Sequence, residues 1–165
     1  MRRALADLPE FTPPEGILLK SFSPGDEKAW EEIIFESFGQ RIDFNEFMEK
    51  DPVYKPERVL FLVVNGDRAA TASAWRSEKY GANTGYLHMV GVSPKHQGKR
   101  FGYHISLAAM HKLKNEGCGE IALQTDDFRL AAIKTYLNLG FEPDLHFHES
   151  IRSRWDAIRS LVNHE

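Results

Sequence analysis

The segment of residues 87–113 changes its hydrophobic period once, and this change limits the folds open to the chain. Residues 87–92 (LHMVGV) read as a strand that stops at Ser93 and Pro94. From Phe101 to Leu113 the apolar residues recur at helical spacing instead. A strand that passes through a short turn directly into an amphipathic helix predicts a sheet with a helix packed on it.

Further strands extend this sheet on both sides of the segment. The runs at residues 58–64 and 69–75 flank Asn65-Gly66-Asp67, and Asn-Gly between two apolar runs favours a tight hairpin. Residues 121–124 predict a strand after the helix, and the next helical pattern ends at Gly140. Antiparallel strands followed by one strand–helix–strand crossover predict an α/β (α+β) fold with a mixed sheet and helices on both faces.

The length of 165 residues predicts one domain that spans residues 1–165. We expect residues 1–15, which contain three prolines, to form an irregular lead-in. A strand at residues 17–22 follows, and Ser23 is expected to cap the first helix with Pro24 at its first position.

The second half of the chain has its own expected boundaries. Asp126 or Asp127 is expected to cap the helix that carries Leu130 and Leu137. Residues 141–147 predict a short strand, and the chain closes with a helix around Trp155.

Composition narrows the possible partners and compartments. The 24 acidic and 21 basic residues give a net charge of −3, whereas a broad nucleic-acid surface needs a basic excess, so we expect no nucleic-acid partner. Cys118 is the only cysteine and cannot form an internal disulfide, which favours a reducing compartment. The longest strongly apolar run, residues 59–64, is too short to cross a bilayer, so we expect a cytoplasmic protein without a membrane partner.

The turn between the strand and the helix has the chemistry of a phosphate site. Unpaired N–H groups at a helix start, together with the helix dipole, favour negative charge. Lys95, Lys99 and Arg100 add full positive charges, and Gly98 and Gly102 let a bulky pyrophosphate approach the backbone. The nucleotide fingerprints GxxxxGK[ST] and GxGxxG do not occur at this turn.

Two motifs resemble those of the GNAT superfamily of acyl-CoA-dependent N-acyltransferases. Gln97 and Gly102 are similar to the ends of its pyrophosphate motif, Gln/Arg-x-x-Gly-x-Gly/Ala, while Arg100 stands where the family usually has glycine. The second match follows the family's Tyr-x-x-x-Gly-Phe helix end and consists of Ala132, Tyr136, Gly140 and Phe141. Arg129 stands seven residues before the tyrosine, where the family often has asparagine.

The resemblance implies a twisted, largely antiparallel sheet in which two parallel strands splay apart to receive acetyl-CoA. It implies direct attack of an amine on the thioester, with backbone N–H groups stabilising the oxyanion. The implied cofactor-binding residues are Val90, Gly91, Val92, Gln97, Gly98, Lys99, Arg100, Phe101, Gly102 and Arg129.

The resemblance also suggests two catalytic residues. Tyr136 matches the family tyrosine that protonates the departing thiolate. His88 is the candidate base, expected on the same strand face as Tyr86 and Val90, and its ordinary pKa predicts a rate that rises through the histidine range. Tyr136 could instead be a core aromatic, and His88 a half-buried strand histidine; Tyr86, Glu78 and Asp126 are alternative bases.

These features predict an N-acetyltransferase that acts on the primary amine of a small molecule or peptide, as a monomer or homodimer. The alternative is a non-catalytic acyl-CoA-binding or sensing module of the same fold. A nucleotide-binding protein fits less well, because the fingerprints are absent. We expect no metal site, since the histidine pairs 104/111 and 146/148 lack cysteine or carboxylate partners at ligand spacing.

Overall fold

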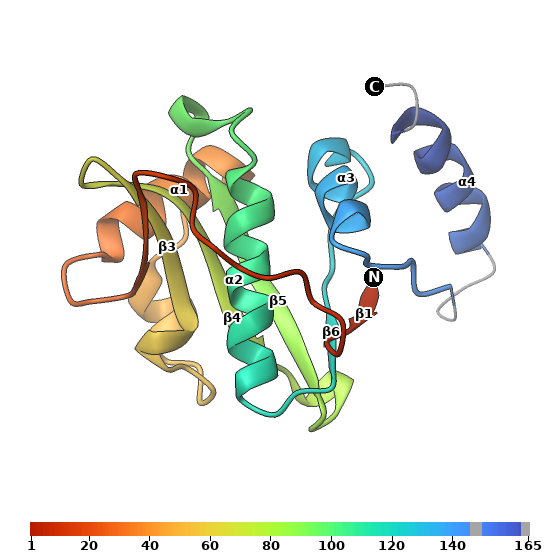
Figure 1. Ribbon diagram of the computed structural model, residues 1–165, viewed down its shortest axis with the longest axis horizontal. Coiled ribbons are helices and arrows are strands. Elements are labelled where there is room, and N and C mark those ends of the chain that lie inside the picture. Colours follow the sequence, from red (N-terminus) through yellow and green to blue (C-terminus); the bar gives the residue numbers. More distant parts are fainter. Residues whose placement is uncertain (146–149, 163–165) are drawn as a thin grey trace.

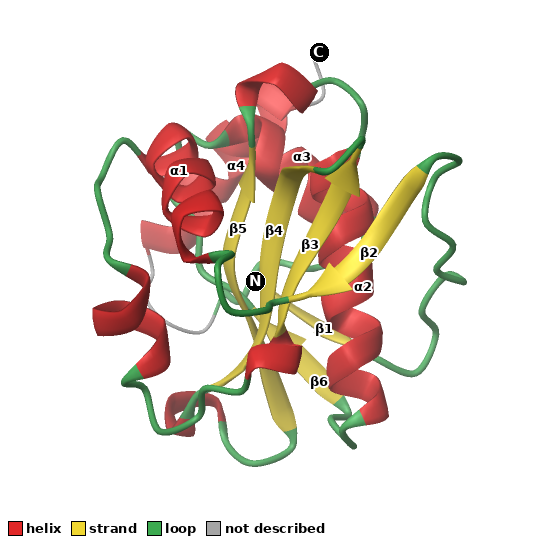
Figure 2. Ribbon diagram, turned by 90° about the vertical axis from the view of Figure 1, so that its left-hand side faces the viewer, coloured by secondary structure: helices red, strands yellow, loops and turns green. Residues whose placement is uncertain are grey.

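The computed structural model describes residues 1–145 and 150–162. Its strands form one six-stranded sheet in the order β1-β6-β5-β4-β3-β2 (Figures 1 and 2). Neighbouring strands are antiparallel except for the parallel pair of β5 and β6. The strands are β1 (Arg2–Ala4), β2 (Ile17–Ser21), β3 (Val59–Val64), β4 (Asp67–Arg76), β5 (Thr84–Val92) and β6 (Glu120–Ala122).

Helices cover both faces of the sheet, which confirms the predicted mixed fold. Figure 2 shows α1 (Glu27–Phe38) on one face and α2 (Phe101–Asn115) on the other. Helix α3 (Leu130–Asn138) follows β6, and α4 (Ser150–Val162) packs on α3 (Figure 1). A short π-helix, Asn45–Glu49, lies between α1 and β3 in the chain.

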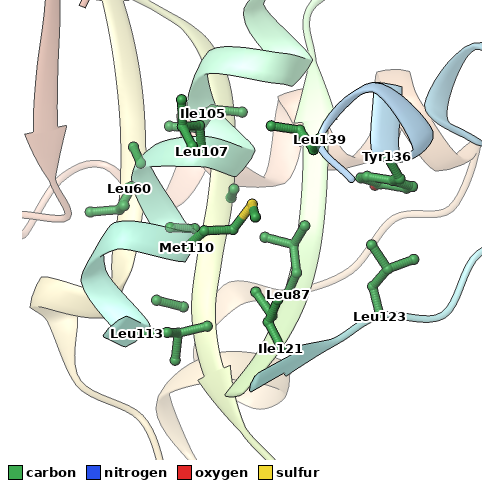
Figure 3. Close-up of a cluster of buried hydrophobic side chains, with 14 of the residues drawn as sticks. Leu60, Leu87, Ile105, Leu107, Met110, Leu113, Ile121, Leu123, Tyr136 and Leu139 are labelled. Carbon is green, nitrogen blue, oxygen red and sulfur yellow. The ribbon is translucent and has the colours of Figure 1, made fainter. Parts of the chain in front are cut away.

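The sheet separates two hydrophobic clusters, because β3 and β4 are buried on both faces. On the α1 side, Trp30, Phe44 and Trp75 are among the buried side chains. The larger cluster lies on the α2 side and reaches Tyr136 on α3 (Figure 3). Its members include Leu60, Leu87, Ile105, Met110, Leu113, Ile121, Leu123 and Leu139.

Strands β5 and β6 pair over only three positions, from Thr84↔Glu120 to Tyr86↔Ala122. The next residue of the chain, Leu123, donates its N–H to the Met1 carbonyl (3.0 Å) instead of continuing the ladder with β5. Among the described residues, no strand therefore lies beside residues 87–92 of β5 on this side. This is the splayed parallel pair that the family resemblance implies.

A bulge interrupts β5 opposite β4. Met89 has a left-handed backbone (φ 49°), and the register shifts between the pairs Ser73↔His88 and Thr71↔Gly91. His88 lies on the α1 face, whereas Val90 packs against the cluster on the α2 face. The prediction that His88 and Val90 share a face is wrong, because the extra residue reverses the alternation.

The expected lead-in and first cap also differ from the structure. Residues 2–4 are not irregular but form β1, an edge strand that pairs with β6. The backbone makes the hydrogen bonds of this pair, so the side chains of the segment do not indicate a strand. Ser23 does not cap α1: its N–H bonds the Asp26 carboxylate (2.9 Å), and Asp26 is the N-cap residue.

Two boundaries in the second half also need correction. Arg129, rather than Asp126 or Asp127, is the N-cap residue of α3, and Asp126 accepts a hydrogen bond from the Arg129 side chain instead. Within the predicted strand at residues 141–147, only an isolated bridge between Glu142 and Arg2 is found, and residues 146 and 147 lie outside the described residues.

Gly91 brings β5 into close contact with α1. A Cβ at this position would lie 2.8 Å from Ser37 Oγ and 2.9 Å from Ile33 Cγ2. At Gly102, by contrast, a Cβ would meet only Val92 Cγ2, at an ordinary 3.7 Å.

We therefore expect Gly91→Ala to lower the free energy of unfolding by about 1–3 kcal/mol, because α1 must move away. Gly102→Ala, in the first turn of α2, should be neutral or stabilising by up to about 1 kcal/mol. Urea unfolding of both variants measures the difference; equal stabilities would contradict the close contact at Gly91.

Candidate functional site

A groove of about 670 Å³ opens where β5 ends and α2 begins, and α1 and α3 form its other walls. We call it the β5–α2 groove. The predicted cofactor residues come together here: Val90, Gly91, Val92, Gln97, Gly98, Arg100, Phe101, Gly102 and Arg129 all line it. Lys99 is exposed beside the groove and is not part of its lining.

The start of α2 gives this groove an anion-binding end. The His104 N–H donates to the Arg100 carbonyl (3.1 Å), so the preceding N–H groups at residues 101–103 have no partner within the helix. These groups and the positive end of the helix dipole lie in the groove lining. The guanidinium of Arg100 adds a charge and lies 4.8 Å from the Tyr103 ring centroid.

Gly98 and Arg100 both have left-handed backbones, with φ of 75° and 58°. Glycine adopts this conformation freely, whereas other L-residues pay about 1–2 kcal/mol for it. The glycine that the family usually has at the position of Arg100 thus corresponds to a real backbone requirement. Arg100 meets the requirement under strain and adds a positive charge at the groove.

A second cavity of about 440 Å³ lies in the gap between β5 and the chain that follows β6. We call it the splay cavity. Residues 86–90 form one side of it, and residues 124–126 form the other. Val90, Arg129, Ala132 and Tyr136 line both the splay cavity and the β5–α2 groove, so the two spaces meet at these side chains.

Tyr136 lies at this junction and is only 7% exposed. Its ring packs edge-on against Phe141 (5.9 Å between centroids), and its hydroxyl has no hydrogen-bond partner within residues 1–145 and 150–162. Burial raises the pKa of the Tyr136 hydroxyl above its ordinary value. Tyr136 is therefore a protonated phenol at neutral pH, and its O–H remains available for donation.

His88 lines the splay cavity within a cluster of aromatic rings. The ring centroids of Tyr86, Phe47 and Trp75 lie 5.2, 5.7 and 5.8 Å from that of His88. Burial lowers the pKa of His88 to about 4, although the Asp51 carboxylate opposes this shift. The expected rate increase through the histidine range does not fit this pKa, because the imidazole is neutral throughout that range.

The alternative bases are placed differently. Tyr86 and Asp126 line the splay cavity, whereas Glu78 is exposed in a 3-10 turn and lines neither space. Burial raises the pKa of Tyr86, so its hydroxyl is also protonated at neutral pH.

Arg129 connects α3 to the end of α1. Its Nη1 donates to the Ser37 carbonyl (3.0 Å), its Nε donates to Asp126 (3.0 Å), and its guanidinium lies 4.3 Å from the Phe38 ring centroid. Ser37 Oγ in turn accepts the N–H of Val92 (3.2 Å). Ser37 is a site residue that sequence reasoning missed; the available signal was a polar side chain within the apolar stripe of α1.

Other expected features are less informative here. Within the part of the chain that the structure describes, no cluster of histidine, cysteine or acidic side chains could hold a metal ion. The His111 ring bonds the Pro9 carbonyl (2.8 Å), while His146 and His148 lie outside the described residues. None of the described helices is long and apolar enough to span a bilayer.

The splayed parallel strands beside an anion-binding helix start are the arrangement expected of an acyl-CoA-dependent acetyltransferase fold. The chain belongs to the acetyltransferase (GNAT) family, whose model matches residues 19–141. The family resemblance in the two motifs is thereby confirmed.

Individual relatives and solved structures agree with this assignment. The chain is 31% identical to a mycothiol acetyltransferase of Actinosynnema mirum over 95% of its own length and 52% of that protein's. It therefore spans about half the length of such curated relatives. A GCN5-related N-acetyltransferase structure from Sphaerobacter thermophilus superposes with a TM-score of 0.69 at 25% identity, covering 86% of this chain and 46% of that one. The ribosomal-protein alanine N-acetyltransferase of Escherichia coli shares the fold, with a TM-score of 0.63 at 22% identity over 76% of this chain and 77% of that one.

The strain at Arg100 can be separated from its charge. Arg100→Gly should raise the free energy of unfolding by about 0.5–1 kcal/mol relative to Arg100→Ala, because only glycine relieves the left-handed backbone. Both variants lose the same guanidinium, so both should bind coenzyme A about tenfold more weakly. Urea unfolding and calorimetry measure the two effects, and equal stability of the variants would rule out strain at this position.

The low pKa of His88 predicts an acid-sensitive fold. The unfolded chain binds this proton at an ordinary pKa of 6.5 and the folded chain only at about 4, so protonation favours unfolding. Stability should fall as the pH drops from 6.5 towards 4, by about 3 kcal/mol at most, and His88→Gln should lack this part of the fall. Thermal unfolding at several pH values tests this, with His111→Gln as the matched control that keeps the wild-type difference. A wild-type pH dependence in His88→Gln would contradict the shifted pKa.

Proposed function

We propose that this protein is an acetyl-CoA-dependent N-acetyltransferase that acts on a primary amine by direct attack. The observation that carries the proposal is the position of Tyr136, a buried and protonated phenol where the β5–α2 groove and the splay cavity meet. If acetyl-CoA occupies the groove and the amine occupies the cavity, the departing thiolate needs a proton donor at this junction.

The groove supplies the features that a coenzyme A donor requires. Its anionic end would lie on the N–H groups and charges at the start of α2. The pantetheine arm would lie along residues 89–92 of β5, whose open edge has no strand partner on that side in the described part of the chain. Acetyl-CoA supplies the thioester; the remaining steps use groups of this chain.

In the proposed reaction the amine nitrogen forms a bond to the thioester carbonyl carbon, and the carbon–sulfur bond then breaks. Backbone N–H groups of β5 near the Met89 bulge stabilise the oxyanion, and Tyr136 gives its proton to the sulfur. The proton lost by the nitrogen is accepted by His88 or by a water beside it and returns to Tyr136. The products are an amide and a free thiol.

A base with a pKa of about 4 does not remove a proton from an alkylammonium ion efficiently. The acceptor is therefore proposed to react as the neutral amine, with His88 accepting the proton that the nitrogen loses after it has attacked. The alternative role, a non-catalytic acyl-CoA sensor, would need no proton donor at the junction.

An assay with a panel of amines decides between these roles. Acetyl-CoA consumption that depends on an amine, with amide formation seen by mass spectrometry, supports the proposed enzyme. Coenzyme A binding without turnover on any amine favours the sensor. Calorimetry that finds tight ATP binding and no coenzyme A binding would overturn both.

The role of Tyr136 has a specific signature. Tyr136→Phe removes one hydroxyl that has no partner in the described structure, so stability and acetyl-CoA affinity should hold while kcat falls by about 10²- to 10⁴-fold. Tyr54→Phe, at a half-buried tyrosine that lines neither space, is the matched control and should retain kcat. An unchanged kcat in Tyr136→Phe, measured by stopped-flow single turnover so that product release does not hide chemistry, would exclude Tyr136 as the acid.

A further inference from the structure

Arg129 is held in one orientation at the wall between the two spaces. Two of its donors are occupied, by the Ser37 carbonyl and the Asp126 carboxylate, each at 3.0 Å. The rings of Phe38 and Phe128 lie 4.3 and 5.2 Å from the guanidinium carbon. Such contacts pre-organise the planar group and reduce the entropy that ligand binding would cost.

Part of this guanidinium remains available to a ligand. The Nη2 amino group and the second N–H of Nη1 have no partner among residues 1–145 and 150–162. The Asp126 side chain is 60% exposed and that of Arg129 only 22%, so the carboxylate lies toward solvent and the cation lies deeper. Arg129 and Asp126 are the only carboxylate or guanidinium side chains among the described residues that line the splay cavity.

This charge distribution bears on the acceptor amine. A cation in the cavity wall disfavours an ammonium ion nearby and favours an oxygen with lone pairs. The cavity is thus suited to an uncharged nitrogen beside a carbonyl or carboxylate oxygen.

We propose that Arg129 determines acceptor specificity by donating its free N–H groups to an oxygen next to the reacting nitrogen, so that the acceptor is an α-amine adjacent to a carbonyl. This class includes amino acids, their amides and the N-terminal residue of a peptide. The assignment rests on the proposed function. General chemistry agrees with it: an α-amino group has a pKa near 8, whereas a lysine-type amine has one near 10.4, so more of the former is neutral at pH 7.

The test compares leucinamide with 3-methylbutylamine, two acceptors that differ only in the carboxamide. Values of kcat/KM are expressed per concentration of neutral amine, which removes the difference in amine titration. Arg129→Gln should lower kcat/KM for leucinamide by about 10- to 100-fold and that for 3-methylbutylamine less than about threefold. The KM for acetyl-CoA should stay within about threefold. The matched control is Arg154→Gln, at an exposed arginine of α4 that pairs with Asp127. It should change kcat/KM for neither acceptor.

Other outcomes separate this assignment from the proposed function. Equal losses with both acceptors, or a rise in the KM for acetyl-CoA alone, would overturn the acceptor role and return Arg129 to the cofactor. If neither amine is acetylated, calorimetry of leucinamide with the coenzyme A complex decides: binding that Arg129→Gln weakens supports the assignment, and binding that it leaves unchanged overturns it. Failure of the wild-type chain to bind coenzyme A would overturn the proposed function itself.

If Arg129→Gln lowers the melting temperature because the link to Ser37 is lost, Arg129→Lys provides the second variant. It retains the charge near α1 but lacks the planar fork, so a selective loss with leucinamide should persist. A full recovery of leucinamide activity would show that charge alone is sufficient and would overturn recognition by the fork.

Discussion

The end of the β5–β6 ladder at Tyr86↔Ala122 is the constraint on which the rest of the site depends. A buried backbone N–H must find a partner, and Leu123 finds it in the Met1 carbonyl of the N-terminal segment rather than in β5. The N-terminal segment that contains β1 thus helps to set the direction of the chain after β6. The diverging chain leaves the edge of β5 free and creates the splay cavity beside it.

Helix α1 packs against the open part of β5 through small residues. The absence of a side chain at Gly91 lets the helix approach, and Ser37 then reaches the Val92 N–H while its own carbonyl accepts from Arg129. One turn of α1 therefore contacts both sides of the groove. A loss of close packing at Gly91 would move both of these hydrogen bonds, which ties the geometry of the site to the core.

Sequence patterns could predict the parts that depend on periodicity and turn chemistry. The hairpin at Asn65-Gly66 and the helix start after Gly98 follow from such local signals, whereas the splayed pair was implied by the family resemblance. Gly91 is a strand glycine and indicates a bulge or a close backbone approach, but it does not indicate that Met89 is the displaced residue. The bulge moved Val90 to the face opposite His88. The pKa of His88 also depends on rings distant in sequence, such as Phe47, whose position only the folded chain defines.

Burial favours the neutral form of both candidate catalytic side chains. Taking a charge out of water is costly, so Tyr136 keeps its proton and His88 loses its own, and each is neutral near pH 7. Two neutral groups offer no charge partner to an ammonium ion, and the partly buried guanidinium of Arg129 opposes a second cation nearby. The same desolvation strengthens any hydrogen bond from Tyr136 to a thiolate that forms beside it. In the proposed reaction, the low polarity at this junction would therefore select the neutral amine and favour proton transfer to the departing sulfur.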